Sequence, residues 1–121
     1  MLSLKMNGPF EFDVETIEAN VSDKRIGNYA LGYKNEKSGN FVVCYVGRAT
    51  DQPLKERLKQ HIGEHPKKYK YFKYSYASTP KEAYLKECIN YHDFGDGGSL
   101  FNEYHPSKIP GDDTLCPICK K

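Results

Sequence analysis

The sequence has no long apolar run, no repeat and little net charge, and each absence narrows the class of protein. No stretch of about 18 apolar residues occurs, so no transmembrane helix is predicted and no membrane partner is expected. The first ten residues lack the apolar run after basic residues that marks a secretory signal, so we expect a cytoplasmic or nucleoid-associated protein that is not secreted. The formal net charge of +2 is too small to indicate nucleic-acid binding by itself.

Length and composition predict one folded domain over residues 1–121, because two complete domains would each approach the size where folding alone becomes marginal. A hydrophobic content of 38% with periodic apolar segments excludes a disordered chain. Segments rich in Gly, Pro and Asp predict loops at 93–99 and 106–113. We expect a core at about 26–104 and a tail at about 105–121.

Local patterns predict a mixed α and β fold. Two β-branched and aromatic runs, 26–33 and 41–47, flank turn-forming residues and predict an antiparallel hairpin. Leu54, Leu58 and Ile62 recur at four-residue spacing after Pro53, which predicts a helix over 53–62.

Three further elements complete the predicted order. Alternating aromatic and polar residues at 69–76 predict a third strand, and weak periodicity within 11–25 predicts a short lead-in helix. A capping box at Thr79 and Glu82, with Pro80 at the first helical position, predicts a helix to about residue 92. The fold class is therefore α+β, with a three-stranded antiparallel sheet flanked by helices.

Positive charge is concentrated between residues 55 and 73. Seven Lys or Arg residues lie there against Glu56 and Glu64, interleaved with Tyr69, Tyr71 and Phe72. This pattern is typical of a basic, aromatic-rich binding surface. It fits equally a solvated helix face followed by a tyrosine-rich strand.

The hairpin carries Gly27-Asn28-Tyr29 on its first strand and Tyr45-Val46-Gly47 on its second. Four polar residues follow later in the chain, namely Arg57, His61, Glu87 and Asn102. In this order and spacing the chain resembles the GIY-YIG nuclease family over residues 27–102. Asn28 departs from the apolar middle residue usual in the first tripeptide.

The resemblance implies a DNA endonuclease in which one tyrosine of the pair Tyr29 and Tyr45 activates the attacking water. A phenol can act as that base if its pKa is lowered, and we expect nearby arginine and metal charge to lower it. Arg57 would stabilise phosphoryl charge, with His61 one turn later on the same helix face.

The remaining roles concern the metal and the substrate. Glu87 supplies a hard oxygen ligand for Mg²⁺ or Mn²⁺, which take one or two protein carboxylates. The resemblance implies that Asn102 holds the substrate or the metal-ligand geometry, and that Arg48 contacts phosphate. Lys59 is a further candidate for substrate binding.

The four cysteines suggest a second, structural site. Cys116 and Cys119 have the spacing of a zinc knuckle, while Cys88 and His92 are four residues apart on the second long helix. We expect these four residues to bind Zn²⁺ and to staple the tail to that helix, with His105 as the alternative to His92. Free buried thiols, a redox pair and disulfides are the competing interpretations. Some relatives in the family end in a similar segment, and Cys44 is expected to be a buried small residue.

The leading hypothesis is thus a metal-dependent endonuclease with DNA as partner, RNA not being excluded, and with a homodimer or a partner protein supplying specificity. One alternative is a non-catalytic nucleic-acid-binding module with the same fold. Another is a zinc-stabilised protein-interaction module. The sequence identifies no target sequence or pathway.

Overall fold

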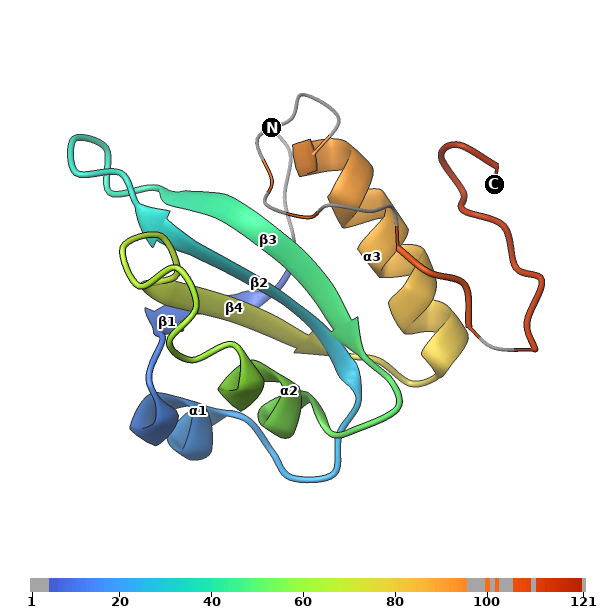
Figure 1. The fold of residues 1–121 in the computed structure, drawn as a ribbon, viewed down its shortest axis with the longest axis horizontal. Coiled ribbons are helices and arrows are strands. Elements are labelled where there is room, and N and C mark those ends of the chain that lie inside the picture. The colour runs from blue at the N-terminus through green and yellow to red at the C-terminus, as the bar shows by residue number, and fades with distance from the viewer. Residues whose placement is uncertain (1–4, 96–99, 101, 103–105, 110, 121) are drawn as a thin grey trace.

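The computed structural model describes residues 5–95, 100, 102, 106–109 and 111–120, and these residues form an α+β fold (Figure 1). The elements follow the order β1 (Asn7–Glu11), α1 (Val14–Asn20), β2 (Gly27–Lys34), β3 (Phe41–Ala49), α2 (Leu54–Gln60), β4 (Tyr71–Tyr76) and α3 (Pro80–Gly95).

The described residues form an antiparallel sheet with strand order β1-β4-β2-β3, so they contribute four strands where the sequence predicted three. The additional strand, β1, pairs with β4 through Asn7↔Tyr74 and Glu11↔Tyr71. Gly8 and Pro9 lie inside β1, and both residues ordinarily argue against a strand. An edge strand tolerates proline because one side of its backbone needs no partner, which is why the prediction was wrong here.

Helices cover both faces of the sheet (Figure 1). On one face, Ile17 of α1 with Leu54 and Leu58 of α2 pack against a core that includes Tyr29 and Phe72. On the other face, α3 packs Tyr91 and Phe94 against Ala30 of β2 and Val46 of β3. The two faces of β2 and β3 therefore belong to different cores, as expected when side chains alternate along a strand.

Side-chain caps mark the starts of α1 and α3, and α3 begins at Pro80 as predicted. Asp13 caps α1 by accepting a hydrogen bond from the Thr16 amide at 2.7 Å, which confirms a short lead-in helix within 11–25. At the start of α3 the Thr79 hydroxyl accepts from the Glu82 amide at 3.1 Å. The Glu82 carboxylate reaches back to the Ser78 amide at 3.4 Å, one residue before the predicted capping-box partner.

The prediction of a loop at 93–99 is wrong for residues 93–95, because α3 continues to Gly95. Phe94 packs on the same core cluster as Tyr91, one turn earlier, and this packing extends the helix through a segment whose composition favours a turn. Within the described residues, no helix is long and apolar enough to cross a membrane.

Candidate active site and metal centre

The position of Tyr29 depends on a glycine in the neighbouring strand. Tyr29 of β2 pairs with Gly47 of β3, and a Cβ at Gly47 would lie 2.4 Å from Cζ and 2.5 Å from the hydroxyl oxygen of Tyr29. The phenol ring therefore lies directly over the Gly47 backbone, where only glycine leaves room. This contact is the physical reason for a glycine two residues after Tyr45.

A chain of hydrogen bonds leads away from the Tyr29 hydroxyl. The hydroxyl oxygen lies 2.7 Å from Nε2 of His61, the C-cap residue of α2. Nδ1 of the same ring lies 2.9 Å from Oε1 of Glu64. A carboxylate only accepts, so Nδ1 carries the proton, and Nε2 of a neutral His61 accepts the Tyr29 hydroxyl.

Glu64 was not among the predicted site residues. The only sequence signal for it is its position three residues after His61, in the turn that follows α2. Many residue pairs in any sequence have this spacing, so it does not predict a hydrogen bond. The pair of His61 and Glu64 is recognised only in the structure, where Tyr29 holds the other ring nitrogen of His61.

Tyr45 completes the aromatic part of the site. Its ring stacks on Tyr29 with centroids 6.1 Å apart, and it lies 5.2 Å from the His61 ring. Tyr29 is 1% exposed, whereas Tyr45 is half-buried and is therefore the tyrosine that solvent reaches. The structure brings Tyr29, Tyr45 and His61 together as predicted.

Burial raises the pKa of Tyr29 above its usual range, and the neighbouring Tyr45 adds to the rise, while the charge and hydrogen bonding of Arg57 oppose it. Burial followed by the negative charge of Glu87 likewise raises the pKa of Tyr45. The sequence predicted a lowered pKa for one of these two tyrosines, and in the protein without metal or substrate both pKa values are raised instead. The reason is that desolvation outweighs the attraction of Arg57.

Arg57 and Lys59 lie on α2 but have different surroundings. Arg57 acts on both phenols and donates from Nη1 to Oε1 of Gln60 at 3.1 Å. Lys59 instead pairs with Glu18 of α1, and its Nζ lies 3.9 Å from Oε1 of Glu56. The Lys59 side chain, predicted to contact substrate, therefore points toward α1 and not toward the tyrosines.

Arg48 forms an ion pair with Glu87, the predicted ligand for Mg²⁺, and both side chains are nearly buried at 13% and 11% exposure. The Arg48 guanidinium also donates to the Ser107 carbonyl at 2.6 Å and lies 5.2 Å from the Tyr84 ring. Glu87 raises the pKa of Tyr29 and Tyr45, which means that its charge acts on the tyrosine pair from α3.

The Asn102 side chain forms hydrogen bonds with both backbone groups of one β3 residue, Val46. Its Oδ1 accepts from the Val46 amide at 3.1 Å, and its Nδ2 donates to the Val46 carbonyl at 2.7 Å. Val46 lies between Tyr45 and Gly47, so Asn102 holds the strand segment that carries half of the site. In this structure it is a positioning residue.

The unusual Asn28 faces away from the tyrosines. It is buried on the α3 face of the sheet, where its Nδ2 donates to the Ala83 carbonyl at 2.9 Å. The departure from an apolar residue is thus accommodated by a bond to the first turn of α3, on the opposite face from Tyr29.

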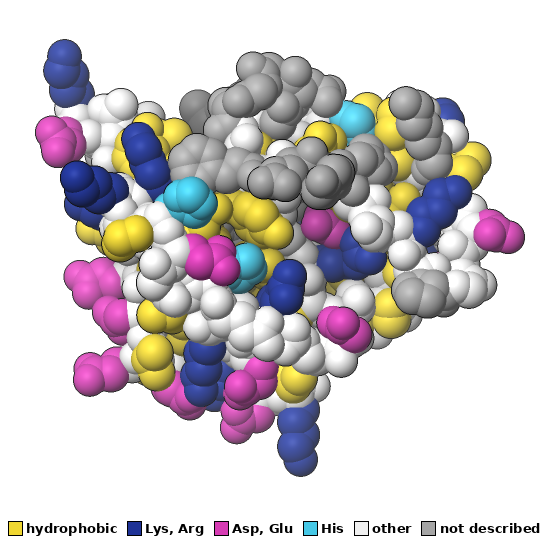
Figure 2. Space-filling model, in the orientation of Figure 1, with side chains coloured by type: hydrophobic (Ala, Val, Ile, Leu, Met, Phe, Trp, Pro, Cys, Tyr) yellow, Lys and Arg dark blue, Asp and Glu magenta, His cyan; other side chains and the backbone are white. Residues whose placement is uncertain are grey.

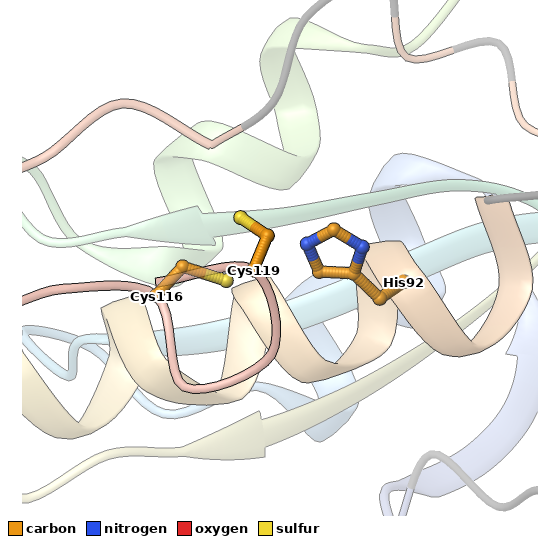
Figure 3. Close-up of side chains that lie close together, drawn as sticks. All are labelled: His92, Cys116 and Cys119. Atoms are coloured by element: carbon orange, nitrogen blue, oxygen red, sulfur yellow. The ribbon is translucent and has the colours of Figure 1, made fainter. Parts of the chain in front are cut away.

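Three of the predicted zinc ligands come together between α3 and the tail (Figure 3). The ligand atoms of His92, Cys116 and Cys119 all lie within 4.8 Å of one another. Cys88 packs in the same buried cluster as Cys116; its pKa is raised to about 12 by burial, and a hydrogen bond with the Cys116 thiol adds to the rise.

Two thiols and an imidazole are the donor set that Zn²⁺ prefers, so a His, Cys and Cys cluster able to hold a metal ion is present. The alternative ligand His105 lies outside the described residues. None of the four cysteines is in a disulfide bond, and Cys44 is buried in β3, as expected for a small core residue.

Comparisons of this chain with protein-family models, with curated proteins and with solved structures find no match.

Proposed function

We propose that this chain is a metal-dependent endonuclease of the GIY-YIG type, which hydrolyses phosphodiester bonds in DNA. One observation carries the proposal: a hydrogen-bonded series joins Tyr29 of β2 to His61 and Glu64, which lie at and just after the end of α2. This series lies beside Tyr45, and the charges of Arg57 and Glu87 act on both tyrosines. A proton acceptor and a fixed cation beside the phenols, with a carboxylate whose charge reaches them, suit the hydrolysis of a phosphodiester.

The proton relay follows from the exposures of the two tyrosines. The attacking water would give a proton to the hydroxyl oxygen of the half-buried Tyr45, and Tyr45 would give its own proton to the Tyr29 hydroxyl oxygen. The Tyr29 hydroxyl would then give its own proton to Nε2 of His61 over the 2.7 Å bond. Glu64 would stabilise the resulting imidazolium through Nδ1. In this scheme His61 holds the proton, so neither phenol needs to exist as a stable phenolate.

The arginines would act on the phosphate. Arg57 lies close to both phenols and offers a planar guanidinium for phosphoryl oxygens. Arg48, which neutralises Glu87 in this structure, would transfer to a phosphate oxygen when substrate binds.

Glu87 is the residue that would hold Mg²⁺ or Mn²⁺. One carboxylate is chemically sufficient, because Mg²⁺ keeps several of its waters, and Glu87 is near enough to influence both tyrosines. The ion would supply charge stabilisation for the phosphoryl oxygens and the leaving oxygen. Arg48 bonds to the same carboxylate and is therefore a competing cation.

The second metal would be structural. His92, Cys116 and Cys119 would hold Zn²⁺, and Cys88, which packs against Cys116, would be the fourth ligand; the ion would tie the tail to α3, next to Glu87. The same tail reaches the active site through the bond from Arg48 to the Ser107 carbonyl.

The test is nicking of supercoiled plasmid by zinc-loaded protein in Mg²⁺ or Mn²⁺. We expect wild type to nick and Glu87→Gln to lose nicking by at least about 100-fold, since the ligand loses its charge. Glu15→Gln is the matched control, because Glu15 is an exposed glutamate of α1. Nicking by Glu87→Gln at the wild-type rate would contradict the proposed mechanism.

A non-catalytic nucleic-acid-binding module is the second candidate. The observation that favours it is the ion pair of Arg48 with Glu87, which occupies the proposed metal ligand. Salt-dependent DNA binding without nicking in either metal would support this candidate over the nuclease.

A further inference from the structure

The turn end of the β2–β3 hairpin bears a cluster of lysines that the proposed active site does not use. Lys34, Lys37, Lys67 and Lys70 line one surface hollow of about 780 Å³, together with the rings of Tyr33 and Tyr71 and one acid, Glu36. All four lysines are exposed, and none forms an ion pair within the described residues. We call these four residues the lysine surface.

The backbone beneath the lysine surface is held in place. Oδ1 of Asn35 accepts from the amides of Lys37 and Ser38 at 2.9 and 3.1 Å, which closes the hairpin turn. The Lys70 amide donates to the Gly32 carbonyl at 2.8 Å, which docks the segment after α2 onto β2. Two stretches of chain more than 25 residues apart are thereby fixed side by side, each presenting two lysines.

Aromatic rings orient the neighbouring ammonium groups. Nζ of Lys34 lies 4.6 Å from the centroid of Tyr71, and Nζ of Lys68 lies 4.8 Å from that of Tyr33. A cation over a ring face keeps its outward side in water while its side chain loses freedom. Ammonium groups held this way can meet a phosphate with less loss of side-chain entropy than free lysines.

The lysine surface lies in line with the active site. Lys34 and Tyr29 are on the same strand, five residues apart, which is about 17 Å at roughly 3.4 Å per residue. B-DNA rises about 3.4 Å per base pair along its helix axis, so this separation corresponds to about five base pairs along the axis.

The charge distribution on this face indicates from which side a nucleic acid would approach the proposed active site. Figure 2 shows Lys and Arg side chains gathered at the upper left, where the hairpin turn lies in Figure 1, and acidic side chains at the lower left, where α1 lies. Glu11, Asp13 and Glu15 lie on or beside α1 and would repel a polyanion from that side.

We propose that the lysine surface is a second contact site for the phosphodiester backbone, which binds the nucleic acid about five base pairs from the bond that is cut. It deepens the proposed nuclease function and rests on it for the identity of the substrate. The lysines contribute sequence-independent affinity and orient the duplex along β2 toward Tyr45.

The test measures binding of a fluorescently labelled DNA duplex by anisotropy, without added divalent cation, between 50 and 200 mM NaCl. The triple variant Lys37→Gln, Lys67→Gln, Lys70→Gln removes three phosphate contacts, so the slope of log K against log salt should fall by about 2.7. The affinity of wild type relative to the variant would then change by about 40-fold across this range. Lys24→Gln, Lys81→Gln, Lys108→Gln is the control, since it removes the same charge from exposed positions elsewhere. Circular dichroism checks that both variants fold.

The outcomes separate this inference from the nuclease proposal. A triple variant with the wild-type salt slope, in a protein that nicks plasmid, would overturn the lysine surface and leave the nuclease intact. A lysine-dependent slope in a protein that nicks nothing would support the lysine surface and overturn the nuclease. Equal loss of affinity in the control variant would also overturn the inference, because net charge alone would explain the effect.

Discussion

The phenol ring of Tyr29 lies across the backbone of Gly47, so closely that a Cβ at residue 47 would come within 2.4 Å of the ring. This contact positions the Tyr29 hydroxyl toward His61, which lies beyond the hairpin on α2. The glycine is thus part of the site's geometry although it has no functional group.

Gly47→Ala should therefore destabilise the fold by about 1–3 kcal/mol and greatly reduce nicking, because the added methyl group overpacks the ring and displaces the hydroxyl. Chemical unfolding measures the first effect and the plasmid assay the second. In the background of Tyr29→Leu, which removes the ring atoms that clash, the same substitution should destabilise much less. Equal destabilisation in both backgrounds would show that the two residues are not coupled.

This part of the site could be predicted from sequence only up to a point. Two strand runs and a turn predict the hairpin, and pairing across it brings Tyr29 and Tyr45 to one face. The reason for Gly47 needs the register Tyr29↔Gly47 and the direction of the ring, and neither is contained in local propensities.

Glu64→Gln should lower kcat for nicking by about 10-fold with little change in KM, because a neutral amide stabilises the imidazolium of His61 less than a carboxylate does. His61→Ala should lower kcat by about 10²- to 10⁴-fold, as expected on removal of a proton acceptor. Glu56→Gln is the control, since Glu56 lies on α2 and points to Lys59. A loss confined to KM would place Glu64 in substrate binding instead.

Asn102→Ala should destabilise the fold by about 1–3 kcal/mol, because two hydrogen bonds to Val46 are lost. Asn102→Asp retains the acceptor for the Val46 amide but turns a carboxylate oxygen toward the Val46 carbonyl, so it should destabilise the fold at least as much as the alanine variant. Urea unfolding measures both. If the alanine variant is fully stable but inactive, Asn102 contacts substrate directly.

Removing zinc, or substituting Cys119→Ser, should lower the melting temperature by about 10 °C or more, because ligand binding energy contributes to folding. Elemental analysis should find one zinc per chain in wild type and less in the variant. Cys44→Ala serves as the control, since Cys44 lies outside the cluster. Full zinc content in Cys119→Ser would contradict the assigned ligand.

Alkaline pH should destabilise the fold through Tyr29. Its pKa is raised in the folded state, so its contribution to stability is complete below pH 10 and is lost as the pH rises above 10, when the unfolded phenol ionises first. The free energy of unfolding should then fall by about 1.4 kcal/mol per pH unit from this group alone.

Tyr29→Phe should remove that part of the slope, while Tyr71→Phe, at a less buried position of β4, should leave it unchanged. Absorbance at 295 nm and urea unfolding at several pH values measure it. An unaltered slope in Tyr29→Phe would contradict the raised pKa.

The other contacts of the site could not be predicted from the sequence, because they depend on how separate elements pack. Arg48 and Glu87 were predicted in separate roles, and their ion pair across the sheet and α3 depends on how the helix crosses the strands. Glu64 bonds to His61, whose ring is also fixed by Tyr29, so no pairwise spacing in the sequence identifies Glu64. Strand β1 was missed because edge position, not propensity, permits its proline.

The two bonds of Asn102 to Val46 also bear on self-association. Strand β3 is at the edge of the sheet, and an open edge is a template on which a second chain can add a strand. The Asn102 amide occupies the donor and the acceptor at the middle of that edge. A second copy could extend the sheet there only by displacing Asn102, and with it the support of the strand segment between Tyr45 and Gly47. Pairing of two chains along β3 would therefore disorder the proposed active site.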